Sequence, residues 1–205
     1  MAQIMAHLPM VATRTSVADS VPTYSAGTAL GKLIAVTMTP NSGAVDLYGD
    51  DAIAESVTTP TQETISLNAT TIPLAAAQVA LGVTVTTDTS QTGLTIKNVK
   101  YKDEQAPFVG FGFIDTELVD GEKTYIVNFY PRAKFQRPAR TSNTKGQAVQ
   151  FSTPTIAGVA YFDEEYGCLK DEYQFAGTNA ATAAVTKLKT LCGLVSQQSS
   201  TTEET

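Results

Sequence analysis

Short stretches in which apolar and polar residues alternate recur along most of the chain. The segment at 23–39 ends in such an alternation, with Val36 and Met38 on one side and Thr37 and Thr39 on the other. A period of two residues is typical of a strand with one buried face. The same pattern, or a short apolar run, predicts further strands at 44–48, 63–71, 83–87, 94–101, 108–118, 123–130, 148–155, 158–162 and 169–175.

Turn and loop signals separate these segments. Pro40-Asn41-Ser42-Gly43 predicts a turn, because these residue types favour tight reversals of the backbone. Asp120-Gly121 predicts a hairpin between the strands at 108–118 and 123–130. The segments at 49–60 and 137–146 are polar and are predicted as loops.

Two segments carry a helical period instead. Residues 73–81 begin with proline and are followed by Gly82, an arrangement that suits the two ends of a helix. Residues 179–192 form the second predicted helix, with Thr178 as its cap and Gly193 as its stop. Its apolar stripe is predicted to consist of Ala181, Val185, Leu188 and Cys192.

These elements predict a mainly β fold. The expected architecture is a β-sandwich or barrel with a short flanking helix and a C-terminal helix. Residues 1–20 have no clean period and are predicted to form an extended N-terminal arm. Residues 21–195 form a single domain in this prediction. Residues 196–205 contain only Ser, Thr, Gln and Glu, so we expect a disordered tail.

Composition narrows the class of protein. Hydrophobic residues make up 42% of the 205 residues, which is enough for a sizeable core, and charged residues only 17%. A low-charge surface suits a protein that hides its exterior in contacts, and it suits an ordinary secreted β domain as well. The net charge of −6 argues against a surface that grips the phosphate backbone of nucleic acid. The first residues lack a signal-peptide pattern, and the chain lacks an apolar run of about 20 residues, so we expect a cytosolic protein with no membrane partner.

The residues available for chemistry are few. His7 is the only histidine, and Cys168 and Cys192 fit no metal-ligand spacing. A zinc site or a nucleophile–histidine pair would need His7, which falls in the predicted arm. We therefore predict that the protein is not an enzyme and binds no metal or cofactor. The cysteines are interpreted as reduced thiols, although a disulfide between them stays open.

Three motifs resemble functional sites. Tyr48-Gly49-Asp50-Asp51 is similar to the paired aspartates of polymerases, but a third carboxylate and a basic groove are not visible in the sequence. Gly110-Phe111-Gly112 lacks the third glycine of a phosphate-binding loop and predicts a strand packed closely against a neighbour. The acidic run at 163–165 is predicted to be a solvated turn, with a weak cation site as the alternative.

Charged residues gather in two segments of opposite sign. The acidic segment contains Asp46, Asp50, Asp51 and Glu55, and the basic segment contains Arg132, Lys134, Arg137, Arg140 and Lys145. Each could be a solvated loop. Together they suit contacts between copies of the chain, with Leu47, Tyr48 and Ile53 supplying apolar burial beside the acidic residues.

A family resemblance runs in order from about residue 10 to residue 193. The segments 24–32 (YSAGTALGK), 46–56 with its LYGDDAIAES run, the helix at 73–81, 108–113 (FVGFGF), 125–135, 150–155 (QFSTPT) and the C-terminal helix carry it. In this order they resemble the major tail protein, or tail tube protein, of long-tailed siphophages that infect Gram-positive bacteria. The LYGDDAIAES run is the most specific segment.

This resemblance implies a structural role. Six copies would join their sheets into a ring, and rings would stack into a tube through which DNA leaves the virion without specific binding. Partners would be further copies of the chain, the tape measure protein and the tail terminator, and the protein would be made in the host cytoplasm and end in the virion tail. A type VI secretion tube protein is the nearest alternative. A surface- or carbohydrate-binding β module is another, although the chain has no Trp to form an exposed aromatic platform.

Overall fold

The computed structural model describes residues 2–17, 20–49, 52–90, 94–101, 106–119, 121–138 and 153–194, with the backbone alone described at 44–49 and 52–61. Strands account for most of this part of the chain, which confirms the prediction of a mainly β fold with one short and one C-terminal helix. The elements are β1 Ala2–Val17, β2 Ser20–Ala29, β3 Leu33–Gly49, β4 Ala52–Ala69, α1 Leu74–Leu81, β5 Thr84–Asp88, β6 Ile96–Lys100, β7 Val109–Val119, β8 Glu122–Phe135, β9 Thr155–Tyr161, β10 Asp171–Ala176 and α2 Ala180–Leu191.

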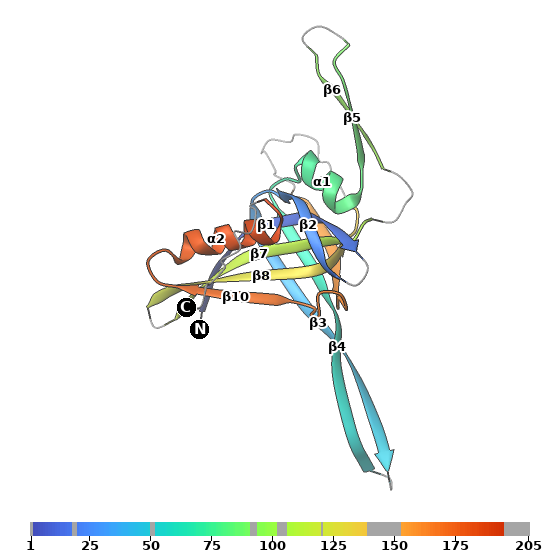
Figure 1. Ribbon diagram of the computed structural model, residues 1–205, viewed down its shortest axis with the longest axis vertical. Helices are drawn as coiled ribbons and strands as arrows, with labels where there is room; N and C mark the ends of the chain where they lie inside the picture. Colours follow the sequence, from blue (N-terminus) through green and yellow to red (C-terminus); the bar gives the residue numbers. More distant parts are fainter. Residues whose placement is uncertain are drawn as a thin grey trace, which may run out of the picture.

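One large antiparallel sheet organises the molecule. Its strand order is β2-β1-β7-β8-β9-β4-β3, and β10 joins it by pairing with β8. The sheet folds over on itself, because Val11 of β1 lies in the same buried cluster as Ile65 of β4 and Ile156 of β9. Strands β5 and β6 form a separate hairpin that projects from the body, and β3–β4 projects in the opposite direction (Figure 1).

Two apolar clusters lie on opposite faces of β7 and β8. Phe111 and Phe113 point into the first, between the two layers of the sheet, which α1 covers with Ala76 and Ala80. Ile114 points into the second, which α2 covers with Ala184 and Leu188. Because both faces are buried, these strands are apolar at nearly every position instead of alternating, as the run at 108–118 indicated.

Gly110 and Gly112 let other elements approach β7 closely. A Cβ atom on Gly112 would lie 2.6 Å from Cδ1 of Leu188 in α2, and one on Gly110 would lie 2.6 Å from the ring of Tyr24. Any side chain at these positions would push the helix or the ring away. The prediction that this motif belongs to a closely packed strand is confirmed.

The helices begin and end close to the predicted residues. Pro73 precedes α1, and Gly82 ends it in a left-handed conformation (φ 65°) with its N–H donating to the Gln78 carbonyl at 3.1 Å. Helix α2 has Asn179, not Thr178, at its N-cap. Its buried stripe contains Leu188 and Cys192 as predicted, but Ala180 and Ala184 replace Ala181 and Val185. Small side chains on this stripe permit the close approach of the helix to Gly112.

The predicted N-terminal arm is instead a strand of the sheet. Residues 2–17 form β1, which lies between β2 and β7, and Val11 and Ala12 are fully buried. The pairing with β7 shifts register between Gln3 and Met5 and again between His7 and Met10. Each bulge reverses which face the following residues occupy, so the two-residue period that would identify a strand is lost from the sequence.

The predicted turn at 40–43 and loop at 49–60 are also wrong. Strand β3 runs through Pro40, which pairs with Glu63, and the pairing shifts register just after it, between Asn41 and Ser42. The turn residues therefore mark a bulge in a long hairpin. Residues 52–60 belong to β4. The hairpin predicted around Gly121 is confirmed, since Val119 pairs with Glu122 and Gly121 has φ 87°. Most of the predicted strand at 148–155 and of the loop at 137–146, and the tail at 196–205, lie outside the described residues.

Candidate assembly surfaces

Strand β8 belongs to two different parts of the sheet. Its first half, from Thr124 to Phe129, pairs with β10, whereas Ala133 to Phe135 pair with β9. On the other side of β7, residues 2–7 of β1 extend the part of the sheet that contains β10. Residues 2–7 do not pair with β2, because the pairing of β2 with β1 begins at Met10. The result is a four-stranded unit made of β1 (2–7), β7, β8 and β10, which we call the outer module.

Helix α2 covers one face of the outer module. The rows on this face read His7–Ile114–Val127–Tyr173 and Met5–Thr116–Tyr125–Phe175 across the four strands. Ile114 and Val127 are fully buried beneath Leu188 of the helix. At the two ends of the rows the cover is incomplete, and Met5 is 52% exposed.

The opposite face of the outer module is mainly polar, although buried Ile126 lies between Asp115 and Gln174 on it. It presents Asp115 and Glu117 from β7, Asn128 from β8, and Glu172 and Gln174 from β10. Asp115 accepts hydrogen bonds from Gln3 (2.8 Å) and Asn128 (2.9 Å), and its partial burial raises the pKa of its carboxyl group. Glu172 accepts from Lys170 (2.8 Å) and Gln174 (3.1 Å). Asp115, Glu117 and Glu172 thus give this face three carboxylates.

Both outer edges of this module lack a neighbouring strand within the described part of the chain. At one edge, the segment 2–7 of β1 pairs only with β7. At the other edge, β10 pairs only with β8. The two edges are each six residues long, and such unpaired edges are templates for pairing with another chain. These edges depend on the strand order and could not be predicted from the sequence, and the structure leaves Ile4 and Met5 exposed at one of them.

The acidic candidates belong to the outer part of the β3–β4 hairpin. Strand β9 accompanies β4 only as far as Gln62, so from Ser42 and Pro60 outward the two strands pair with each other alone. Asp46, Leu47, Tyr48, Ile53 and Glu55 occupy these strands, where the backbone alone is described. Asp50 and Asp51 lie outside the described residues. The hairpin carries these positions well away from the sheet body (Figure 1).

The basic candidates gather around two aromatic rings at the other end of β8. The Arg132 guanidinium lies 4.4 Å and the Lys134 ammonium 5.4 Å from the centre of the Phe108 ring. Arg137 lies 4.1 Å from the centre of the Tyr101 ring. A cation therefore lies over each ring, and Phe108 and Tyr101 remain 36% and 48% exposed. Arg140 and Lys145 lie outside the described residues. The outer part of the β3–β4 hairpin extends away from the sheet that contains β8 (Figure 1).

The acidic run at 163–165 is not simply a solvated turn. Asp163 is buried and accepts a two-pronged interaction from Arg14 of β1, with Nε at 2.9 Å from Oδ2 and Nη2 at 3.1 Å from Oδ1. Its Oδ1 also accepts the backbone N–H of Glu165 at 3.1 Å. Glu165 accepts from Arg14 as well, at 2.8 Å. The arginine occupies the position that a cation would take, which ties β1 to the turn before β10.

His7 is part of the rigid sheet. Its ring is half-buried at the edge of the outer module, and its Nδ1 atom is buried with no hydrogen-bond partner among the described residues. Burial lowers the pKa of His7, and the charge of Asp115 partly opposes that shift. Cys192 is buried and Cys168 half-buried, and both are free thiols.

Comparisons and residue geometry assign no chemistry to the chain. No protein-family model matches it, and no curated protein sequence is significantly similar to it. Within the described ranges, no three His, Cys, Asp or Glu side chains are placed to hold a metal ion. Neither helix in this part of the chain is long and apolar enough to cross a bilayer.

Proposed function

We propose that this protein is the structural subunit of a phage-type tail tube, which assembles with copies of itself into stacked rings that conduct DNA. The observation that carries the proposal is the outer module. It has two unpaired edges of equal length, one face covered by α2 and one mainly polar face. The resemblance described in the sequence analysis supplies the expected ring of six copies.

Strand direction in the module is compatible with ring closure. Neighbouring strands run antiparallel across β1, β7, β8 and β10. A ring keeps the strand directions of every copy, and the module contains an even number of strands. The edge of β10 therefore meets the β1 edge of the next copy in antiparallel orientation, and the alternation continues without a break around the ring.

In this proposal the polar face points toward the inside of the ring. Helix α2 fills the space outside the sheet, so the face with Asp115, Glu117 and Glu172 lines the lumen. A lining rich in carboxylates repels the phosphates of DNA and lets it slide. Joining the edges also removes six-residue templates for aggregation.

Stacking of rings is assigned to the projecting hairpin. The outer part of β3–β4 extends away from the body of its own chain (Figure 1), so in this proposal its acidic positions reach the Arg132, Lys134 and Arg137 surface of a neighbouring copy. A single exposed pair contributes only about 0–1 kcal/mol. Because the pair is repeated in every copy around a ring, these small contributions add up and favour the correct alignment of one ring on the next.

Electron microscopy of the purified protein tests the proposal directly. We expect rings or tubes of constant diameter. A variant in which residues 44–58 are replaced by an Asn-Gly turn, joining the paired positions Gly43 and Thr59, should fold normally and form rings that do not stack. Only monomers or closed dimers, at every salt and protein concentration tried, would overturn the tail-tube assignment.

A further inference from the structure

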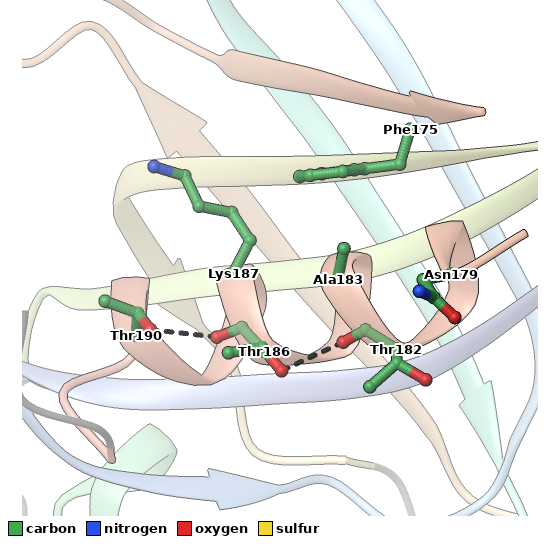
Figure 2. Close-up of a pocket in the computed structure, with 7 residues that line it drawn as sticks. All are labelled: Phe175, Asn179, Thr182, Ala183, Thr186, Lys187 and Thr190. Atoms are coloured by element: carbon green, nitrogen blue, oxygen red, sulfur yellow. Dashed lines mark hydrogen bonds between the residues drawn. The ribbon is translucent and has the colours of Figure 1, made fainter. Parts of the chain in front are cut away.

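A shallow groove runs between α2 and β10 on the helix-covered side of the outer module. It is lined by Phe175 of β10 and by residues of the outward face of α2, which are Asn179, Thr182, Ala183, Thr186, Lys187 and Thr190. Figure 2 shows the Phe175 ring above Ala183, with Lys187 extending along the same side. The groove opens beside the unpaired edge of β10.

The groove is less polar than its sequence suggests. The hydroxyl of Thr186 donates to the carbonyl of Thr182, and that of Thr190 donates to the carbonyl of Thr186, each at 2.9 Å (Figure 2). These bonds turn the hydroxyls toward the helix backbone. The ammonium of Lys187 lies 4.1 Å from the centre of the Tyr173 ring. The groove therefore offers methyl groups and the face of Phe175 to an apolar side chain.

An exposed apolar side chain lies at the opposite edge of the module, in the same row as Phe175. Met5 lies at one end of the row that Phe175 ends, on the same face of the sheet, and it is 52% exposed. The adjacent Ile4, at the bulge, is 53% exposed. Side chains on a strand alternate between faces, so every register that keeps the polar face continuous from copy to copy also keeps Met5 on the α2 side.

We propose that the groove between α2 and β10 is the receptor for Met5, together with Ile4, of the neighbouring copy in the ring. This inference rests on the proposed function, because it requires the β10 edge to meet the β1 edge of a second copy. When they meet, Met5 lies beside Phe175 or beside the next residue of β10 on the same face, and it fills the groove against Ala183. Backbone pairing alone fits any exposed strand, so this docked side chain supplies the selectivity for the correct neighbour.

Cross-linking between separate chains tests the contact. One chain carries Met5→Cys and a second, mass-tagged chain carries Ala183→Cys, both with Cys168→Ser. Cys192 is fully buried, and a link between the two introduced cysteines can form only between copies. After co-assembly and brief treatment with a short bifunctional maleimide, we expect the mixed dimer to be the main product. Val21→Cys, at a position on β2 that is 61% exposed, replaces Ala183→Cys in the control and should give little mixed dimer.

A second set of variants measures the contribution of the docked side chain. Met5→Glu should raise the critical concentration for assembly at least about tenfold, because it places a charge in the groove, whereas Met5→Leu should change it little. Val21→Glu is the matched surface control and should assemble normally. Urea unfolding of the monomers should be alike for all three, because each side chain is exposed in the single chain.

The outcomes separate this inference from the proposed function. Rings without the Met5–Ala183 cross-link, formed equally well by Met5→Glu, would overturn the receptor and leave the tail-tube proposal standing. The specific cross-link in dimers that never close would support the receptor and count against the ring. Absence of any association would overturn both.

Discussion

Two long antiparallel strand pairs of this chain have opposite surroundings. Strands β7 and β8 lie between two apolar clusters, and nearly every residue of their middle portions is buried. The outer part of β3–β4 pairs only with itself beyond Gln62 and projects from the body (Figure 1). An isolated two-stranded ribbon is marginally stable in water. The first pair therefore stabilises the subunit, whereas the second would gain stabilising contacts from another copy in the proposed tube.

The largest effect on subunit stability is expected from Phe111→Ala. Its ring is fully buried and packs against Phe113, Tyr130 and Phe135 with centroids 5.3–6.2 Å apart. Removing it leaves a cavity, so the free energy of unfolding should fall by about 3–5 kcal/mol. Urea denaturation measures this loss. A loss below about 1 kcal/mol would show that β7 and β8 do not carry the stability of the fold.

The next effect comes from a pair of strand glycines, one from each region. Gly112→Ala should destabilise the subunit by about 1–3 kcal/mol, because its Cβ atom would lie 2.6 Å from Leu188 and 2.9 Å from the Asn128 carbonyl oxygen. Gly43→Ala, on β3, has no atom within 4 Å of the new Cβ and should be nearly neutral or slightly stabilising. Equal losses of unfolding free energy from the two substitutions would show that β7 and β3 do not differ in packing at these glycines.

A smaller effect is expected from pH at His7, on the edge of the outer module. Burial lowers the pKa of His7 in the folded state below the ordinary value of 6.5, so the unfolded chain binds the proton more readily. Stability should therefore fall as the pH drops through about 6.5 toward the folded pKa. His7→Gln should weaken this slope between pH 7 and 5. An unchanged slope, measured by thermal unfolding across that range, would place the pH dependence in other groups.

The smallest effect on the subunit is expected from Asp50 and Asp51, which the sequence predicts to be solvated. Reversing both to Lys should leave the melting temperature within about a degree or two, since substitutions of solvated residues cost little. Tube formation should nevertheless be impaired, and reversing Arg137 and Arg140 in the same chain should restore part of it. Microscopy and light scattering follow both variants. Normal tubes from the aspartate variant, or no rescue, would show that the acidic and basic segments do not meet.

Sequence patterns predicted the regular elements of the fold better than its exceptions. The helices and most of the central strands were predictable, because α1 and α2 have strong end signals and β7 has an unbroken apolar run. Strand β1 was missed since two bulges scramble its period, and β3 was cut short because Pro40 and Gly43 look like a turn when they flank a bulge. These are cases in which tertiary pairing overrides local preference.

The candidate surfaces were only partly predictable. Clustering of Arg132, Lys134 and Arg137 was visible as a charge pattern, but the rings of Phe108 and Tyr101 beneath them come from positions just before β7 and just after β6. The sequence predicts Asp163 to be a surface acid. Its pairing with Arg14 could not be predicted, because the two residues are 149 positions apart. The unpaired edges depend on the whole strand order, which no local pattern contains.

The number of strands in the outer module sets the width of any conduit built from it. Six copies contribute twenty-four strands, and at about 4.8 Å per strand with a tilt of about 35–45° the backbone wall closes at a diameter of roughly 45–52 Å. Each copy gained or lost changes this diameter by roughly 8 Å in one step. The diameter of such a channel can therefore change only in discrete steps. A subunit that inserts or deletes a strand pair in this module would change the diameter of the whole channel.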